Sequence, residues 1–328
     1  MYSLDGLSGK TIVVTGASGY IGSTLVEALV KRSCNVIRVS RTDLEQIRGT
    51  KTIKADVRKA GTWNRVVEQA EIIYHLAGST SVYEAAKKPA ESLNSTLLPL
   101  AHLIKAAQEK NRKPRVVFTS TATVYGLTSR HPVTEVIEPK PATFYDLNKL
   151  FAEQQLSLAA QQGLIESVSL RLANVYGPSG SASFASDRGI LNKVTEMALR
   201  GRDLMIYGGG NYCRDYVYIT DVVNALLYAG ITPGLGGQVY NVASGVGTTV
   251  REAFHMVASQ AVAITKIPVN VNDTVWPTGV ASIELRDFIA DISKYSAATH
   301  WRPVVSLNQG IALLIAEYMK KVSVSFFD

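Results

Sequence analysis

Short runs of apolar, mostly β-branched residues alternate along the first half of the chain with longer segments of helical periodicity. Residues 11–14 (TIVV) form the first run, and apolar positions recur every three or four residues from 21 to 32. An uninterrupted apolar run of this length is typical of a strand buried on both faces of a parallel sheet. The same pattern predicts further strands at 35–39, 72–76, 115–120 and 167–172, with helices over 93–109 and 145–162. We therefore expect an α/β fold with a Rossmann-type, doubly wound parallel sheet.

The pattern loosens after Tyr176, where the small polar residues of 178–187 predict a loop. Shorter elements follow it: strands at 204–207, 215–219, 239–242 and near 267–271, and helices at 190–200, 221–228, 248–258 and near 307–320. We expect a dinucleotide-binding domain over 1–177, to which 217–245 returns, and a smaller C-terminal α/β substrate lobe from 178–216 and 246–328. In such open sheets ligands bind beyond the carboxyl ends of the strands.

Three glycines follow the first predicted strand in the sequence TGASGYIG, with the spacing GxxGxxG. Gly16 allows the tight turn out of the strand, Gly19 lets the backbone approach a pyrophosphate, and Gly22 lets the helix sit close to the sheet. The N–H groups at the start of that helix favour phosphate groups. The loop predicts a dinucleotide site, and a purely structural turn is the alternative.

The second strand ends in Ser40 and Arg41, where an NAD site usually has an acidic residue that holds the ribose 2′-OH. A guanidinium beside a hydroxyl suits a 2′-phosphate instead. We therefore expect NADP(H) to be preferred over NAD(H). The alternative is a solvated Arg41, with Asp43 turned back toward the ribose.

Tyr145 and Lys149 lie four residues apart in a predicted helix, which places them on one face. A nearby ammonium favours the phenolate form of a tyrosine, so the pair can take or give a proton while a nicotinamide exchanges hydride. Thr121 ends the preceding strand and can hydrogen-bond the reacting oxygen. Taken alone, Tyr-x-x-x-Lys would more often be an exposed pair, but its position after this strand favours catalysis.

Composition adds limits on compartment and partners. Hydrophobic residues make up 46% and charged residues 19%, within the globular range, and the net charge of +7 favours anionic partners. The basic residues are scattered, so we expect no nucleic acid as a partner. Two distant cysteines, no membrane-length apolar run and no signal-peptide pattern at the start predict a cytoplasmic protein. We expect no metal site, and we expect His75 to be a hydrogen-bonded core residue.

Eight ordered motifs carry a family resemblance: TGASGYIG, ADVR (55–58), HLAG (75–78), Asn94, TSTATVYG (119–126), YDLNK (145–149), RLANVYGP (171–178) and RDYVYITDV (214–222). The chain resembles an extended short-chain dehydrogenase/reductase of the branch that modifies nucleotide sugars. The resemblance implies a nucleotide-diphosphate sugar as substrate. It also implies a homodimer formed through the helices near 97–108 and 145–162.

The resemblance, together with the reasoning above, assigns roles to named residues. The catalytic residues would be Thr121, Tyr145 and Lys149. Cofactor binding would involve Gly16, Gly19, Tyr20, Ile21, Gly22, Ser40, Arg41, Asp56, Val57, Leu76, Ala77, Gly78 and Thr119, together with Tyr145 and Lys149. Substrate binding would involve Thr121, Asn174, Tyr207 and Arg214, with Arg214 on the diphosphate unless it pairs with Asp215, and Tyr207 beside the base. Trp276 and the three residues after it are a further candidate part of the sugar pocket. Arg286 is a doubtful diphosphate ligand, because the spacing of the motif around it is compressed.

Departures from the family pattern narrow the choice of reaction. Sugar-nucleotide dehydratases and decarboxylases of this family carry acidic residues just after the catalytic threonine, where this chain has Ala122 and Thr123. Neither can act as the acid or base of an elimination. Two NAD(P)-dependent reactions remain, reduction of a 4-keto nucleotide sugar and 4-epimerisation of a nucleotide sugar. Ser40 and Arg41 favour the reductase, because a reductase must exchange its cofactor each turnover; the epimerase is the alternative. A non-catalytic dinucleotide-binding regulator is less favoured, since Thr121, Tyr145 and Lys149 are all present.

Overall fold

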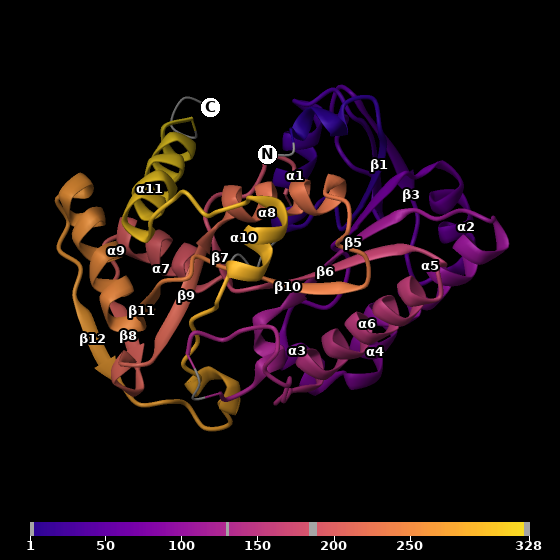
Figure 1. Ribbon diagram of the computed structural model, residues 1–328. Coiled ribbons are helices and arrows are strands. Elements are labelled where there is room, and N and C mark those ends of the chain that lie inside the picture. Colours follow the sequence, from indigo (N-terminus) through magenta and orange to yellow (C-terminus); the bar gives the residue numbers. More distant parts are fainter. Residues whose placement is uncertain (1–2, 129–130, 184–188, 325–328) are drawn as a thin grey trace.

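A seven-stranded parallel sheet forms the centre of the larger part of the molecule, in the order β10-β6-β5-β4-β1-β2-β3 (Figure 1). The computed structural model describes residues 3–128, 131–183 and 189–324. The strands are β1 Thr11–Thr15, β2 Asn35–Ser40, β3 Thr50–Lys54, β4 Ile72–His75, β5 Arg115–Thr121, β6 Glu166–Leu172 and β10 Gln238–Val242. The predicted Rossmann-type α/β fold is confirmed.

Helices cover both faces of this sheet, as short apolar strands require. On one face lie α2 (Ala60–Gln69), α5 (Leu98–Glu109) and α6 (Phe144–Gln161), which pack through buried residues such as Trp63, Leu103 and Leu156. Two short helices, α3 (Val82–Lys87) and α4 (Pro89–Thr96), lie against α6. The other face holds α1 (Tyr20–Val30), α8 (Ile219–Ile231) and a short 3₁₀ helix, η1 (Leu4–Leu7).

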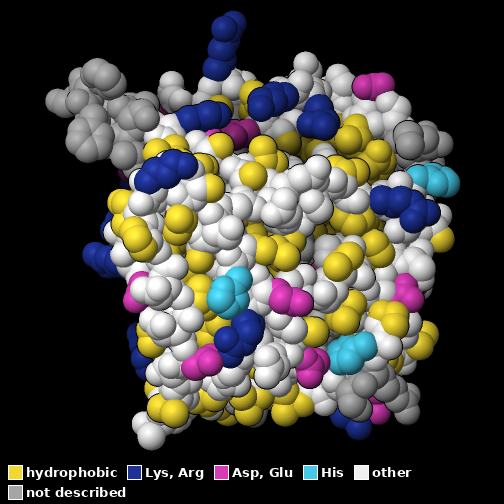
Figure 2. All heavy atoms as spheres, turned by 90° about the vertical axis from the view of Figure 1, so that its left-hand side faces the viewer, with side chains coloured by type: hydrophobic (Ala, Val, Ile, Leu, Met, Phe, Trp, Pro, Cys, Tyr) yellow, Lys and Arg dark blue, Asp and Glu magenta, His cyan; other side chains and the backbone are white. Residues whose placement is uncertain are grey.

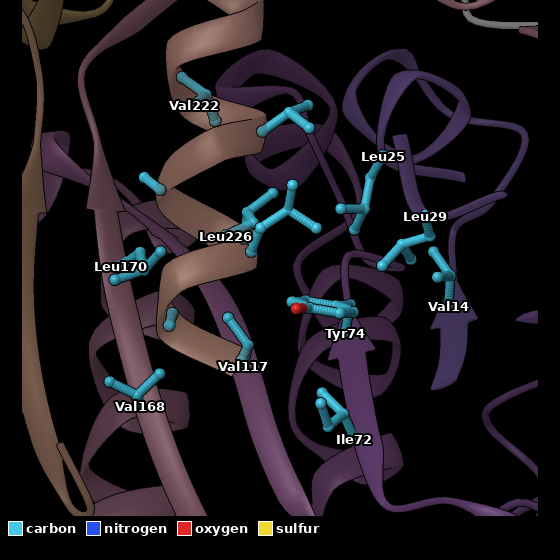
Figure 3. Packing of buried hydrophobic residues seen from close by; sticks show 14 of the residues in the cluster. Val14, Leu25, Leu29, Ile72, Tyr74, Val117, Val168, Leu170, Val222 and Leu226 are labelled. Atoms are coloured by element: carbon cyan, nitrogen blue, oxygen red, sulfur yellow. The ribbon is translucent and has the colours of Figure 1, made fainter. Parts of the chain in front are cut away.

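The centre of the second face is a fully buried apolar cluster around α8. Figure 3 shows Val222 and Leu226 of α8 packed among side chains from α1 and from β4, β5 and β6. Tyr74 also lies in this cluster, in a strand otherwise made of β-branched residues and His75. A helix from residues 219–231 is therefore part of the core of the larger sheet. Burial of these side chains stabilises the platform by roughly 1.5–3 kcal/mol each.

The smaller part of the molecule, at the left of Figure 1, has two small sheets and three helices packed around them. Its strands are β7 Asn174–Tyr176, β9 Cys213–Tyr218 and β11 Gly247–Thr249 in one sheet, and β8 Leu204–Tyr207 and β12 Val271–Thr274 in the other. Its helices are α7 Ile190–Leu199, α9 Val250–Thr265 and α11 Leu307–Val324. Another helix, α10 (Ser293–Thr299), packs on β10 of the large sheet. The domain boundaries expected from the sequence remain a prediction.

Figure 2 shows the face of this smaller part, where hydrophobic side chains are interspersed with polar ones and Lys and Arg side chains gather toward the upper edge. Along the ranges that the structure describes, no helix is both long and apolar enough to cross a membrane.

Three expectations about local structure need correction or comment. The strand expected near 267–271 is wrong: Pro268 cannot donate to a ladder, Lys266 has a φ of +61°, and the pairing with β8 begins only at Val271. The helix expected over 93–109 is two helices, since α4 ends at Thr96 and Pro99 lies in the first turn of α5. In the loop expected at 178–187, residues 178–183 are irregular, and the remainder lies outside the described residues.

Candidate active site

A cavity of about 890 Å³ lies at the carboxyl ends of β1, β2 and β4. Its walls include most of the residues predicted to bind a dinucleotide: Gly16, Gly19, Ser40, Arg41, Asp56, Val57, Leu76, Ala77 and Gly78. Ser92 and Ser95 of α4 close its far side. The place agrees with the rule that open parallel sheets bind ligands beyond their carboxyl ends.

The glycine loop needs glycine at two of its positions for steric reasons. Gly16 has a φ of +68°, and a Cβ there would lie 2.8 Å from the backbone nitrogen of Ala77. A Cβ on Gly22 would overlap the carbonyl oxygen of Gly16, which already accepts a hydrogen bond from the Gly19 N–H at 2.9 Å. No side chain caps the first turn of α1. The loop therefore brings bare backbone and a helix N-terminus to the edge of the cavity, where they can hold a pyrophosphate.

Two arginines and two carboxylates lie at the end of the cavity beside β2, and Asp56 is the less exposed of the two carboxylates. Arg41 is exposed and lines the wall, and Asp43 is paired with Lys54 at 2.6 Å. Asp56 accepts from Arg58, with Nη2 and Oδ2 2.6 Å apart. These hydrogen bonds lower the pKa of Asp56 to about 2, and Arg41 contributes to that shift through its charge. Asp56 is therefore an anion across the working pH range and can accept a hydrogen bond from a ribose or adenine group.

Lys149, on α6, lies beside Gly78 of the cavity wall. Its Nζ donates to the carbonyl oxygen of Thr119 at 2.8 Å and lies 5.9 Å from the centre of the Tyr145 ring. A Cβ on Gly78 would lie 4.0 Å from the same Nζ, so the ammonium is next to the cavity wall. Burial lowers the pKa of Lys149 to about 8, while the charge of Glu153 opposes that shift. The helical spacing of four residues thus places the Lys149 ammonium next to the ring of Tyr145.

Thr121 is the last residue of β5 and belongs to a row of hydrogen-bonded side chains. Its Oγ1 lies 2.8 Å from Oγ1 of Thr123, and the Thr123 N–H donates to it at 3.2 Å. The hydroxyl of Thr123 in turn donates to the carboxylate of Asp146, whose other oxygen accepts from Thr143 at 2.7 Å. Burial raises the pKa of Asp146, and the hydroxyl donors and Arg286 act in the opposite direction.

Substrate-side candidates meet where β7, β9 and the segment after β12 come together. The guanidinium of Arg214 donates to the carbonyl oxygens of Glu284 and Arg286, so it holds the segment that carries Arg286. Arg286 in turn lies 3.3 Å from the amide oxygen of Asn174. Burial, and after it the charge of Arg214, lower the pKa of Arg286 to about 10. Two neighbouring guanidinium groups suit a diphosphate, since each carries a positive charge and five N–H groups, of which the contacts above use only a part.

Two contacts bear on the expectations about the arginines, whose role toward a diphosphate stays a prediction. The compressed spacing around Arg286 suggested a doubtful ligand, yet the fold brings it beside both Asn174 and Arg214. Asp215, the alternative partner of Arg214, instead accepts hydrogen bonds from the backbone of Ser244 at 2.7 Å and of Gly245 at 3.0 Å.

Aromatic rings continue the substrate side of the site. Tyr207 stacks on Trp276 with ring centres 5.3 Å apart, and Tyr212 stacks on the same indole at 6.1 Å. The guanidinium of Arg214 lies 4.6 Å above the ring of Tyr212. Tyr207 and Trp276 were separate candidates in the sequence, and the structure joins them into one aromatic wall that leads to the arginines.

The remaining candidates lie apart from the cavity wall. Tyr20 donates to the carbonyl oxygen of Gly177 at 2.7 Å, Ile21 packs against the α8 core, and Thr119 contributes its carbonyl to Lys149. His75 is fully buried and shares a 2.8 Å hydrogen bond with Thr15, as expected of a core histidine. Burial lowers its pKa to about 3, so it stays neutral. Among the described residues, no group of three His, Cys, Asp or Glu side chains is arranged to hold a metal ion.

Residues 12–243 match the model of the NAD dependent epimerase/dehydratase family. The chain belongs to this family. The membership confirms the resemblance to extended short-chain dehydrogenases and the expectation of an enzyme of that type.

Members of the NAD dependent epimerase/dehydratase family with a known activity or structure are similar to the chain over nearly its whole length. A UDP-glucose 4-epimerase of Mycolicibacterium smegmatis is 30% identical over 319 residues, which cover 94% of this chain and 98% of the relative. The structure of a UDP-glucose 4-epimerase of Thermotoga maritima with UDP-glucose has a TM-score of 0.84 and 28% identity, covering 95% of this chain and 99% of that one. A UDP-glucose 4-epimerase of Thermus thermophilus in complex with NAD has a TM-score of 0.79 and 26% identity, covering 94% and 99%.

Sequence reasoning missed one buried network behind the family's catalytic residues. Glu153 forms a two-pronged ion pair with Arg171, with Oε2 and Nη2 2.6 Å apart, and also accepts from Ser120. The guanidinium of Arg171 lies 4.7 Å above the ring of Tyr125. The sequence held a signal for this ion pair. Glu153 follows Lys149 by one helical turn, so both lie on one face of α6. In β6, Arg171 is the only charged residue after Glu166.

Proposed function

We propose that the protein is a nucleotide-sugar 4-epimerase that inverts the configuration at C4 of a UDP-hexose. The observation that carries the proposal is the row Thr121, Thr123 and Asp146 beside Tyr145 and Lys149. This row offers hydroxyls to a reacting oxygen and places no acidic side chain at positions 122 and 123 for an elimination. The similarity to UDP-glucose 4-epimerases over almost the whole chain supports the same reading.

In the proposed reaction the C4 hydroxyl donates its proton to Thr121, while the Thr121 hydroxyl gives its own proton to the phenolate of Tyr145. A bound nicotinamide would supply a hydride acceptor and donor for C4, and the residues that line the cavity around Gly16, Gly19 and Gly78 would hold its dinucleotide. The ammonium of Lys149 stabilises the phenolate while its bond to the Thr119 carbonyl fixes its position. Tyr145 then returns the proton to the oxygen at C4, so that no net oxidation occurs.

Arg214 and Arg286 would hold the diphosphate of the substrate, and the aromatic wall of Tyr207 and Trp276 would receive its base. Keeping the diphosphate fixed while the 4-ketosugar turns is what presents both ring faces to the same cofactor. Arg214 and Arg286 suit that requirement, because they would bind the diphosphate and not the sugar.

A 4-ketosugar reductase remains the second candidate because of Arg41. For the ribose end of the cavity we propose that Arg41 contacts a 2′-phosphate, so that NADP(H) is preferred over NAD(H). Asp43, the carboxylate that would otherwise serve a 2′-OH, is paired with Lys54. A reductase would use this preference to draw on reduced NADP, whereas an epimerase would retain its cofactor between turnovers.

We also propose a homodimer formed through α5 and α6. Phe144, Phe151 and Leu158 are spaced by seven residues on α6 and are 53%, 44% and 54% exposed. Leu98 adds an exposed apolar side chain on the neighbouring α5. A stripe with this period on one helix fits packing against a second helix pair.

The experiment that separates the two candidates starts from freshly purified protein. The protein is denatured, the released dinucleotide is identified, and native protein is incubated with UDP-glucose without added cofactor while UDP-galactose is followed by NMR. The epimerase predicts retained dinucleotide and formation of the C4 epimer. An empty site, no epimer, and consumption of NADPH only with a UDP-4-ketosugar would overturn it in favour of the reductase.

A further inference from the structure

We propose that Asp146 is a positioning residue that fixes the hydrogen-bond direction in the Thr123–Thr121 row, so that Thr121 can both accept from an alcohol and donate to a ketone. This inference rests on the proposed epimerase and goes beyond it, because Asp146 was not among the predicted site residues. The carboxylate is fully buried beside Tyr145 on α6 and touches the row through Thr123.

Two hydroxyl groups donate to the carboxylate of Asp146. An ionised carboxylate can only accept hydrogen bonds. Its Oδ1 accepts from the hydroxyl of Thr123, and its Oδ2 accepts from that of Thr143. The single proton of the Thr123 hydroxyl is therefore committed to Asp146, and the Thr123 oxygen is left as an acceptor.

The direction of the Thr123 hydroxyl affects Thr121, because the two hydroxyl oxygens are 2.8 Å apart. Since Thr123 cannot donate its hydroxyl proton to Thr121, the only bond that Thr121 Oγ1 accepts within the row comes from the Thr123 N–H, at 3.2 Å. One lone pair and one rotatable proton of Thr121 remain for other uses.

An epimerase needs both the lone pair and the proton of Thr121, because the C4 oxygen is a hydroxyl at one stage and a ketone at the next. When the sugar carries a C4 hydroxyl, the free lone pair of Thr121 accepts from that hydroxyl, and the Thr121 proton turns to the phenolate of Tyr145. When the sugar carries a C4 ketone, the same proton turns to the ketone oxygen. Without the carboxylate, the Thr123 hydroxyl would donate to Thr121 and occupy the lone pair that the alcohol needs.

The test uses the whole protein with UDP-glucose and compares four variants. In Asp146→Leu the freed Thr123 hydroxyl turns to Thr121, and we expect kcat/KM to fall about ten- to one-hundred-fold, as for loss of a hydrogen bond to the reacting group. Thr123→Val removes that hydroxyl and should cost less than Asp146→Leu. In the double variant the blocking donor is gone, and kcat/KM should recover to within about fivefold of Thr123→Val. The fourth variant, Thr299→Val, removes a buried hydroxyl that lies outside the row and donates to the carbonyl oxygen of Tyr295 at 2.7 Å, so it should lower stability but leave kcat/KM within about threefold of the unmodified protein.

Recovery in the double variant is what a merely structural role of Asp146 would not produce, because two damaged packing sites in contact would not repair each other. A double variant that is worse than both single variants overturns the inference. Dinucleotide affinity and the unfolding transition of each variant identify those that have simply lost their fold. Asp146→Asn, whose side-chain oxygen can still accept from the Thr123 hydroxyl, is the conservative variant and should lower kcat/KM by less than about fivefold. A loss of about tenfold or more in a folded Asp146→Asn overturns the inference. Failure of the proposed function is read separately, from the unmodified protein alone. If that protein forms no epimer, the same variants are compared by their affinity for UDP-glucose, and unchanged affinity in Asp146→Leu overturns the inference.

Discussion

The ammonium of Lys149 lies 2.8 Å from the carbonyl oxygen of Thr119, the residue two before the catalytic Thr121. A neutral carbonyl orients the ammonium without neutralising it. Glu153, the carboxylate one turn further along α6, is bonded to Arg171. The positive charge of Lys149 is therefore left to act on Tyr145, at the cost of holding a cation in a buried place.

Because burying the ammonium of Lys149 costs stability, replacing this lysine should lower activity and raise stability. Lys149→Met should abolish most of the activity, about a hundredfold or more, because the phenolate of Tyr145 loses its stabilising charge. It should also raise the free energy of unfolding at pH 7, by on the order of 1–3 kcal/mol, since burial lowers the pKa of Lys149 from 10.5 to about 8. Urea unfolding at pH 7 measures the second effect.

The pH dependence of the stability of Lys149→Met tests whether the buried ammonium causes the difference. Between about pH 8 and 10.5 unfolded Lys149 binds more protons than folded Lys149, so the penalty is fully present below pH 8 and disappears as the pH rises toward 10.5. The stability advantage of Lys149→Met should therefore shrink between pH 7 and pH 9.5. Lys105→Met, an exposed lysine on α5, is the matched control and should show no such change. A variant that is less stable than the unmodified protein at pH 7 contradicts this account.

Tyr145→Phe tests the proton-transfer role without changing the packing of the ring. We expect turnover to fall about a thousandfold while the affinities for UDP-glucose and for the dinucleotide change less than about threefold, because only the phenolic oxygen is removed. Pre-steady-state hydride transfer followed at the nicotinamide absorbance, together with calorimetric binding, measures both. Unchanged turnover would leave the protein without an identified acid–base group.

Arg41→Asp should shift cofactor preference rather than destroy cofactor binding. A carboxylate repels a 2′-phosphate and accepts from a 2′-OH, so NADPH affinity should fall at least tenfold more than NADH affinity. Fluorescence titration with both cofactors measures the ratio. Arg202→Asp makes the same change of charge at an exposed position in the smaller part of the molecule, and it should leave the ratio unaltered. Equal losses of both cofactors in Arg41→Asp would reject the 2′-phosphate contact.

Arg214 and Arg286 should act as one unit toward the diphosphate. Each change to Met should weaken UDP-glucose binding about ten- to one-hundred-fold. Because Arg214 also holds the main chain of residues 284–286, its loss already displaces Arg286, and the double variant should cost less than the sum of the single ones. Arg200→Met, which breaks an exposed ion pair with Glu196 in the same part of the molecule, is the control. Strictly additive losses would mean that the two arginines bind independently.

The sequence predicted well the elements that produce a local periodic pattern. Apolar strands such as Arg115–Thr121 and the glycine turn before α1 were found because their signals lie within a few neighbouring residues. The strand Thr50–Lys54 escaped, because at the sheet edge its side chains are largely exposed and its pattern is polar.

The parts of the site that escaped depend on contacts between distant residues. Arg286 meets Arg214 across 72 positions of sequence, and Asp146 reaches Thr123 across 23. Neither pairing leaves a periodic trace, so spacing within a motif could not reveal it. The compressed motif around Arg286 could not show that Arg286 lies beside Arg214 and Asn174, because the fold and not the spacing brings these residues together.

The stripe on α6 gives the last prediction, which concerns assembly. Phe151→Glu should place a charge in the middle of the proposed interface, where it would have to lose its water without a partner, and should convert a dimer to a monomer. Sedimentation velocity at micromolar concentration distinguishes the two species, and the secondary structure of the variant should be unchanged because Phe151 is already 44% exposed in the single chain. Val136→Glu adds the same charge at a side chain that is 92% exposed and lies outside the stripe, and it should leave the dimer intact. An unmodified protein that sediments as a monomer at all concentrations would remove the proposed interface, and a dimer that survives Phe151→Glu would place it on another face.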